Sequence, residues 1–282
     1  MAIESLSVLT ETGEGKAYLA QVYGPVIENV FKENISTLFK NDDIYGDIKA
    51  GTIVARKFAN TGVNKLGTAR TNGKGDNIKA QDINIDLDDD IEKIHEVSEK
   101  DVKTYGVEGL VQRRAAQDQV EIAKYIEEKF WAEAATAGKQ FTSTATGINK
   151  KVNAAIVDLE KTKDNFVKGV PRSLMGLVLS PEAYTELQDY IDEIKNHATG
   201  NTYEVYHKVQ VFCSTDLPDG VDGVLLCKKS IAQPFLPLEV TPGKIPLSTS
   251  YAFGIAGSLG TKATSPELIR VLTGLTTEPA AE

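Results

Sequence analysis

The feature that most constrains this chain is a long stretch without helix breakers. Between Gly109 and Gly138 there is no glycine and no proline, although the 282 residues include 23 Gly and 10 Pro. Apolar residues recur here at spacings of three, four or seven, as in a helix with one buried face. The stripe comprises Val107, Val111, Ala115, Ile122, Ile126, Phe130 and Ala134, broadened by Leu110, Ala123 and Trp131. This pattern predicts one helix over residues 104–137, roughly 45 Å long at ~1.5 Å per residue, along which the other segments must pack.

The other positions of this predicted helix are polar and are expected to face solvent. They are Arg113, Arg114, Gln117, Asp118, Glu121, Lys124, Glu127, Glu128 and Lys129. Replacing Glu127 by alanine should therefore be nearly silent. Gly138 is placed to end the helix in a left-handed backbone conformation.

The segments before this helix predict an arm and a long two-stranded excursion. Residues 1–45 are expected to form an arm, with a helix whose first turn contains Pro25 and whose apolar side chains need a covering surface. Strands are predicted over residues 46–58 and 77–87, the second from alternation at period two. The loop between them, residues 60–77, is rich in Gly, Asn, Thr and Lys, and loops of that length are usually functional or disordered.

Charge is distributed unevenly along this excursion. The loop and its flanks are basic, with Arg56, Lys57, Lys65, Arg70, Lys74 and Lys79 against Asp76. The next segment is acidic, with Asp82, Asp86, Asp88, Asp89, Asp90, Glu92, Glu96, Glu99 and Asp101 against Lys93 and Lys100. A basic hairpin tip and an acidic strand in one chain suit contact between neighbouring copies.

The second half of the chain alternates helices and strands. An amphipathic helix is predicted over residues 148–163 and a buried strand over 173–180. A second helix should begin with Ser180 as its N-cap, Pro181 at its first position and Glu182 in its first turn. Further strands are predicted at 205–215 and 221–230.

Motifs for catalysis, nucleotides or metals are not found in the sequence. There is no glycine-rich nucleotide loop in a strand-to-helix context and no nucleophile elbow. His207 and Cys213 lack the further ligands that zinc needs, and the run Asp88, Asp89 and Asp90 lacks a glycine-turned calcium loop, which favours a solvated face. Cys213 and Cys227 are expected to be reduced and buried. We therefore expect no enzyme activity, no cofactor and no metal.

Composition narrows the class of protein further. The net charge of −9 argues against general nucleic-acid binding by the whole surface, although a local basic patch is allowed, and 41 % hydrophobic residues suffice for a sizeable core. The sequence has no apolar run long enough to span a bilayer and does not begin like a signal peptide. The expectation is a soluble protein made in the cytoplasm, without a membrane partner.

Two stretches carry a resemblance to a known family. GVPRSLMGLVLSPEAYTELQD, residues 169–189, is similar to a strand and helix pattern of the major capsid proteins of tailed bacteriophages with the HK97-type fold. VEGLVQRRAAQDQVEIAKYIEEKFW resembles their spine helix. The order of the predicted elements along nearly the whole chain resembles that family as well.

The resemblance implies an α+β fold with an N-terminal arm (1–45), an extended loop (46–80), a peripheral domain (81–138 and 240–282) and an axial domain (139–239). It implies a non-enzymatic shell protein that forms pentamers and hexamers of an icosahedral head around double-stranded DNA. Such a protein would assemble in the host cytoplasm, reside in the virion, and have a portal and a separate scaffolding protein as partners. Inter-subunit contacts are expected between the loop residues Lys65, Arg70 and Lys74 and the acidic residues Asp88, Asp89 and Asp90.

Two other functions stay open at this point. An encapsulin-like compartment would use the same fold to enclose cargo enzymes instead of a genome. A soluble α/β enzyme would use residues 60–77 as an active-site lid.

Overall fold

The structure is a computed structural model that describes residues 5–47, 52–60, 79–98, 100–102, 106–195, 202–238, 240–246 and 248–276. The chain divides into two compact units. The first unit comprises Met1–Leu38, Asp86–Lys129 and Gln233–Gly260, and the second comprises Phe39–Ile85, Phe130–Ala232 and Thr261–Glu282. Helix α5 contributes residues to both.

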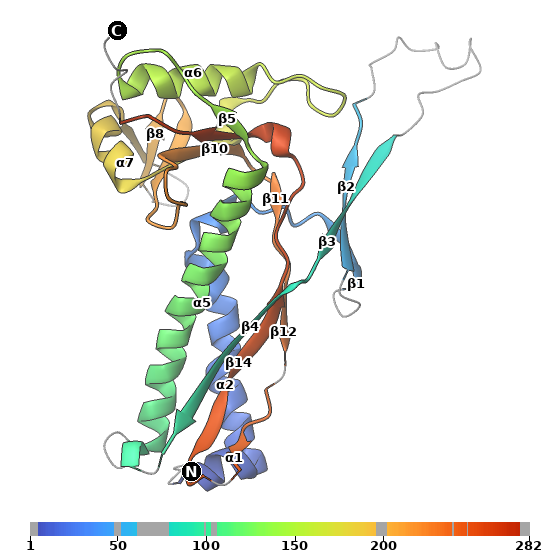
Figure 1. Ribbon diagram of the computed structural model, residues 1–282, viewed down its shortest axis with the longest axis vertical. Helices are drawn as coiled ribbons and strands as arrows, with labels where there is room; N and C mark the ends of the chain where they lie inside the picture. Colours follow the sequence, from blue (N-terminus) through green and yellow to red (C-terminus); the bar gives the residue numbers. More distant parts are fainter. Residues whose placement is uncertain are drawn as a thin grey trace, which may run out of the picture. The chain divides into compact units, whose positions relative to one another are not determined.

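The predicted long helix is confirmed as α5, Val107–Ala137 (Figure 1). Every residue of the predicted stripe is buried except Ala123, which is partly buried. Two of the positions expected to face solvent are buried instead: Asp118 is 0 % exposed and Glu127 is 4 % exposed. Each of these carboxylates has a polar partner, described below.

Gly138 follows the helix for a reason other than the predicted one. Its φ angle is not positive, so it does not need the left-handed conformation. A Cβ at this position would lie 2.5 Å from the carbonyl oxygen of Ala134 and within 2.8 Å of side-chain carbons of Ile269 and Val271. The site excludes a side chain because strand β16 passes against the helix end.

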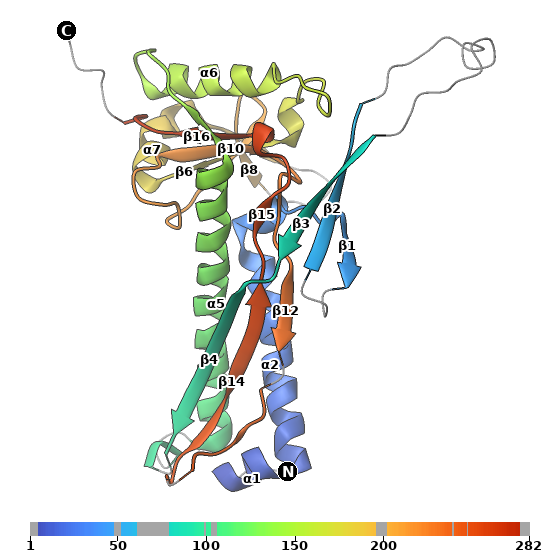
Figure 2. The ribbon, with the colours of Figure 1, turned by 45° about the vertical axis from the view of Figure 1, so that its right-hand side comes forward.

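The first unit packs helices against an antiparallel sheet. Besides the first part of α5 it contains α1 (Leu6–Glu11), α2 (Gly13–Glu33), the 3-10 helix η1 (Ile35–Leu38), β4 (Asp89–Val97), β12 (Phe235–Leu238), β13 (Gly243–Lys244) and β14 (Tyr251–Leu259). Strand β14 pairs with β4 over nine positions, from Tyr251 opposite Val97 to Leu259 opposite Asp89, and also pairs with β12 and β13. Figures 1 and 2 both show α2 beside α5, next to this sheet.

The N-terminal segment differs from the predicted arm. Thr12 caps α2 by accepting a hydrogen bond from the Gly15 amide, and Pro25 lies inside this 21-residue helix instead of in its first turn. Proline removes one backbone hydrogen bond. The helix continues through it because Leu19, Tyr23 and Val26, on both sides of the break, are buried in the core of the first unit. These apolar side chains are covered by their own subunit.

The second unit contains a mixed seven-stranded sheet with the order β5-β16-β10-β6-β9-β8-β7. The strands are β5 (Lys139–Phe141), β6 (Met175–Leu179), β7 (Asp192–Lys195), β8 (Thr202–Tyr206), β9 (Val209–Cys213), β10 (Gly223–Cys227) and β16 (Ile269–Leu272). The pairs β5/β16 and β6/β9 are parallel, and the others for which the register is known are antiparallel. The remaining elements are α6 (Ile148–Glu160), η3 (Arg172–Leu174), α7 (Pro181–Leu187), η4 (Gln188–Tyr190), β11 (Ile231–Ala232), β15 (Lys262–Ala263), η5 (Pro266–Leu268) and the strands β1 to β3 described below.

Each face of this sheet has its own apolar core. The buried face of α6 packs with alternate residues of β6, Met175, Leu177 and Leu179, and with side chains of α7. Gly176, between them, faces the other side, where a Cβ would lie 2.1 Å from the ring of Phe39. Phe39 in turn makes edge-to-face contacts with Trp131 and Phe212.

The predictions for this unit are largely confirmed. All five residues of β6 are buried, and Ser180 caps α7 by accepting a hydrogen bond from the Ala183 amide. The strand predicted at 205–215 is instead a hairpin of β8 and β9, turned by His207 and Lys208 at φ 49° and 71°. Of the two reduced cysteines, Cys227 is buried, but Cys213 is exposed, contrary to expectation.

Candidate assembly surfaces

The predicted excursion begins in a three-stranded stem, ordered β1 (Ile44–Asp47), β2 (Thr52–Phe58) and β3 (Ala80–Asp86). The first predicted strand is in fact two antiparallel strands, with Tyr45 opposite Val54. The alternation predicted for the last strand is confirmed, since Ile85 is buried while its neighbours Asn84 and Asp86 are exposed.

The two faces of the stem differ in burial. Ile53 and Ala55 lie on one face of β2 and are buried. The intervening residues belong to the opposite face, where Tyr45 is 62 % exposed and Phe58 is 57 % exposed. Large exposed aromatics on one face of a sheet are typical of a surface that contacts another molecule.

The open face of the stem holds a shallow groove of about 490 Å³, lined by Tyr45, Gly46, Val54, Arg56, Phe58 and Asp82. Across it, Arg56 Nε and Nη2 donate to the two carboxylate oxygens of Asp82 at 2.7 and 2.9 Å. These hydrogen bonds lower the pKa of Asp82 and raise the pKa of Arg56. The pair joins β2 to β3 beside the two aromatics.

Lys57, on the buried face of the stem, is not available to a neighbour. Its ammonium pairs with Glu267 and lies 4.7 Å from the centre of the Phe166 ring. Next to it, the Asn60 amide donates to the carbonyl oxygen of Asn165 at 2.8 Å. The base of the excursion is thereby attached to η5 and to the turn after α6.

The predicted basic contact residues Lys65, Arg70 and Lys74 lie outside the described residues. The acidic residues predicted to meet them are described. Asp88 is exposed, whereas Asp89 accepts the Tyr125 hydroxyl at 2.9 Å and pairs with Lys129 at 3.1 Å. Asp90 accepts the Ser258 hydroxyl at 2.5 Å. Two of the three predicted acidic contacts therefore have partners within their own subunit.

A second groove of about 490 Å³ lies between α5 and the β4/β14 pair. Its apolar lining consists of Ile91, Ile122, Tyr125, Phe235, Ile255 and Ala256. Its charged lining consists of Asp90, Glu92, Lys93 and Glu121, and Lys93 forms an ion pair with Glu121. Hydrogen bonds from Lys93 and then from Gln117 lower the pKa of Glu121. The rim is acidic overall.

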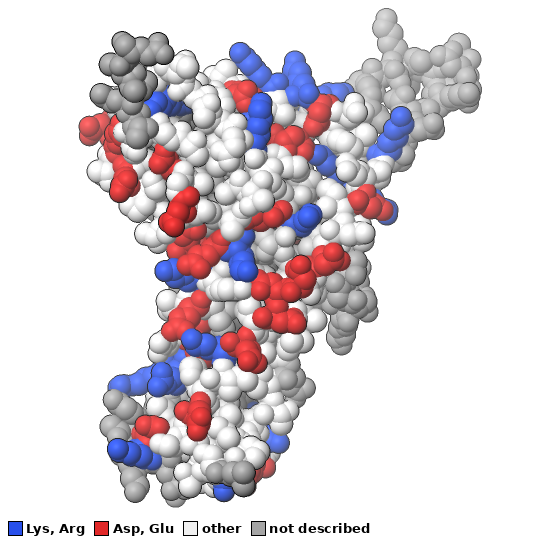
Figure 3. Space-filling model, viewed as in Figure 1, with Lys and Arg blue, Asp and Glu red and all other residues white. Residues whose placement is uncertain are grey.

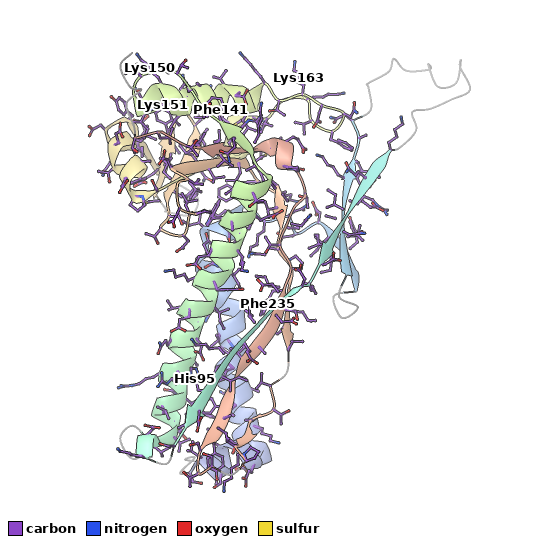
Figure 4. All side chains as sticks on the ribbon, viewed as in Figure 1. His95, Phe141, Lys150, Lys151, Lys163 and Phe235 are labelled. Atoms are coloured by element: carbon purple, nitrogen blue, oxygen red, sulfur yellow. The ribbon has the colours of Figure 1, made fainter. Side chains whose placement is uncertain are left out.

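A buried polar cluster joins three elements of the first unit. Nε2 of His95, on β4 (Figure 4), lies 2.8 and 2.7 Å from the carboxylate oxygens of Asp118 on α5. The Tyr23 hydroxyl of α2 donates to the same carboxylate at 3.3 Å. Burial, and then the charge of Asp118, raise the pKa of Tyr23. This cluster was not predicted from the sequence, although Asp118 lies three residues after Ala115 and four before Ile122 and so occupies a stripe position.

Glu127 accepts a hydrogen bond from the backbone amide of Ser36, just inside the start of η1. The distance from its Oε1 to the amide nitrogen is 3.0 Å, and Asn34 donates to the carbonyl oxygen of Ala123 one turn earlier on α5. The expectation that Glu127 is solvated and replaceable is therefore wrong. Its position four residues before Trp131, on the broadened side of the stripe, is the signal that could have indicated burial.

Within the described ranges, no group of three or more His, Cys, Asp or Glu side chains is arranged to hold a metal ion. Across the same ranges, none of the helices combines the length and apolarity needed to cross a bilayer.

Comparison with known proteins identifies the fold. No family model matches the sequence, and no curated protein sequence matches it. Solved structures do match. One from Mycobacterium phage Che8 has 14 % identity and a TM-score of 0.59, covering 84 % of this chain and 89 % of that chain. The capsid of cyanophage P-SCSP1u has 13 % identity and a TM-score of 0.57, covering 84 % and 86 %.

A third matching structure is an encapsulin complex. The SrpI encapsulin complex from Synechococcus elongatus PCC 7942 has 10 % identity and a TM-score of 0.53, covering 88 % of this chain and 90 % of that chain. The chain has the α+β fold of the HK97-type capsid proteins, as its resemblance to them implied.

Proposed function

We propose that this chain is a major capsid protein that assembles as pentamers and hexamers into an icosahedral head around double-stranded DNA. The observation that carries the proposal is the HK97-type fold over 84 % of the chain. The stem adds support, because its open face displays Tyr45 and Phe58, which a neighbouring subunit would cover.

The proposal includes the division of labour expected from the sequence. Residues 1–45 would act as the arm, 46–80 as the extended loop, 81–138 with 240–282 as the peripheral domain, and 139–239 as the axial domain. The exception is β16, which pairs with β5 and β10 and so would belong with the sheet of the axial domain. A portal and a separate scaffolding protein would be partners during assembly in the host cytoplasm, and the virion would be the final location. The protein would act without catalysis.

The alternative with specific support is an encapsulin-like compartment, since the SrpI encapsulin shares the fold. The two functions differ in what the shell contains. A phage head encloses DNA, whereas a compartment of this kind encloses protein cargo.

Electron microscopy of the purified protein should show closed shells or pentameric and hexameric rings. We expect this because exposed apolar side chains on the stem are stabilised when neighbours bury them. Shells purified from cells that carry the whole gene neighbourhood should contain nuclease-protected DNA. Shells with a co-purifying enzyme and no DNA would favour the compartment, and a monomer at all salt and protein concentrations would overturn both proposals.

We further propose that the basic loop binds an acidic surface of the adjacent subunit. Lys65, Arg70 and Lys74 would be the donors. Asp88 is the best acceptor of the predicted trio because Asp89 and Asp90 already have partners, and exposed Glu92 lies near it on β4. Each exposed pair contributes only ~0.2 to 1 kcal/mol, so the effect would depend on repetition over many subunits.

Reversing Lys65, Arg70 and Lys74 together to glutamate should impair assembly while the subunit still folds. Added salt should also weaken assembly of the wild type, because it screens the contacts that the charge reversal removes. The Debye length is only ~8 Å at physiological ionic strength. Light scattering across a salt titration measures assembly, and circular dichroism measures folding. A matched control reverses the exposed residues Lys16, Lys124 and Lys244, which changes the net charge equally.

Limited proteolysis supplies an independent measurement of the same contact. Cleavage within residues 60–77 should be much faster in free subunits than in shells. Normal assembly of the triple variant at every salt concentration, or equal cleavage rates in both states, would show that the loop does not bind the neighbour.

A further inference from the structure

Helix α6 presents a basic face on the side opposite its buried face. Ile148, Val152, Ala155, Ile156 and Leu159 are buried against the seven-stranded sheet. Lys150 and Lys161 are both exposed. They are eleven positions apart, which places them within about 20° of each other around the helix and ~16 Å apart along it, opposite the buried residues.

The acidic residues of α6 do not offset these lysines. Asp158 accepts Nε of Arg270 at 2.6 Å, and Glu160 accepts Nε and Nη2 of Arg172 at 2.6 and 3.0 Å. Arginine has thus neutralised each carboxylate from within the same unit. The hydrogen bonds from Arg172 lower the pKa of Glu160, so it remains ionised and paired.

Of two further lysines, one is buried and the other is exposed. Lys151 points under the helix, where its ammonium donates to the carbonyl oxygens of Gly274 and Leu275. Lys163 is exposed and extends the row of Lys150 and Lys161 beyond the helix end (Figure 4). No carboxylate of the described residues forms an ion pair with Lys150, Lys161 or Lys163.

Two carboxylates lie next to this row. One is Glu160, which pairs with Arg172 and whose pKa is also lowered by the charge of Lys161. The other, Asp164, is exposed, and its Oδ1 accepts the amides of Phe166 and Val167 at 2.7 and 2.6 Å, so it caps the turn. In Figure 3, Lys and Arg side chains gather along the upper edge over α6 and the turn after it, in a chain whose net charge is −9.

We propose that the row Lys150, Lys161 and Lys163, here called the α6 lysine row, binds the phosphate backbone of double-stranded DNA without reading its sequence. The row has no aromatic or bidentate arginine group that could read bases. Lysine ammonium groups on a straight helix face suit a duplex that carries one charge per ~1.7 Å of axis. This inference rests on the proposed function, because it assigns a surface to the enclosed DNA.

Replacing the three lysines together by glutamine tests the proposal on unassembled full-length subunits. Fluorescence anisotropy with a mixed-sequence duplex of about 30 base pairs, at about 50 to 200 mM salt, measures binding. For three lost phosphate contacts, the slope of log K against log salt should become shallower by ~2.7. The control variant replaces exposed Lys16, Lys124 and Lys244 by glutamine and should keep the wild-type slope.

The outcomes separate the possible roles of the row. A slope that changes only in the α6 variant supports the proposal. Equal slopes in both variants, or no duplex binding by the wild type, overturn it. Failure of the α6 variant alone to form shells would identify the row as a subunit contact and would also overturn it. Absence of shells from the wild type would contradict the proposed capsid function, and the duplex measurement would still be readable.

Discussion

Replacing Phe130 by alanine should lower the free energy of unfolding of the subunit by about 3 to 5 kcal/mol. Phe130 is fully buried in α5, with its ring 5.0 Å from the ring of Trp131 in an edge-to-face arrangement. Truncation removes apolar surface from the core and leaves a cavity. Denaturant unfolding of unassembled subunits measures the change as a shift in midpoint at constant slope.

Two neighbouring residues provide the controls for this variant. Glu128 is exposed and lies 3.8 Å from Lys124, so Glu128→Ala should change stability by less than about 0.5 kcal/mol. Glu127→Ala should be intermediate, at about 1 to 3 kcal/mol, because the buried Ser36 amide loses its acceptor. Equal effects of Phe130→Ala and Glu128→Ala would show that the buried face of α5 has been assigned incorrectly.

Replacing Asp118 by alanine should cost about 2 to 5 kcal/mol. The substitution removes a fully buried carboxylate and leaves His95 and Tyr23 without their acceptor in the interior of the first unit. The loss of stability should be larger for Asp118→Ala than for Asp118→Asn, because asparagine keeps the shape of the side chain and one acceptor oxygen. It should also exceed the loss for Tyr23→Phe, since the hydroxyl contact at 3.3 Å is the longer one. A ranking in which Tyr23→Phe is the most damaging would contradict this account.

Ionisation of Tyr23 gives a second measurement of the same cluster. Its pKa is raised in the folded protein by burial and by Asp118. The folded state therefore holds this proton more tightly than the unfolded state, in which tyrosine has a pKa of about 10. The resulting stability is complete below that pH and is lost as pH rises above it. In Asp118→Asn, ultraviolet titration should show Tyr23 ionising at lower pH than in the wild type.

The periodic parts of the fold were predictable from sequence because the burial of each element leaves a regular pattern of apolar residues. The stripe of α5, the continuous apolar run of β6 and the Ser180 cap of α7 depend on residues within a few positions of each other. Burial of one helix face or of a whole strand leaves a pattern that neighbouring residues record. The order of these elements was enough to indicate the HK97-type fold.

The chemistry of the polar residues on α5 was decided by contacts distant in sequence. Asp118 and Glu127 are acidic residues like their solvated neighbours on α5. Asp118, however, contacts His95 and Tyr23, and Glu127 accepts the Ser36 amide. A helical wheel assigns charged residues to solvent because burying an unpaired charge is unfavourable. Here Tyr23 and His95 lie 95 and 23 residues from Asp118, and Ser36 lies 91 residues from Glu127, so no local pattern could predict these partners.

The same distinction applies to the candidate assembly surfaces. The sequence alone determined that the excursion is basic near its tip and acidic beyond it, since net charge depends only on composition. Only the tertiary structure decided that Asp89 and Asp90 are engaged by Tyr125 and Ser258, and that Lys57 is held by Glu267. It also decided that arginines neutralise the acids of α6, that Lys151 is buried, and that Lys150 stays exposed. The physical reason is that a charged side chain is available to another molecule only if no opposite charge of its own subunit lies close to it. Folding sets that distance.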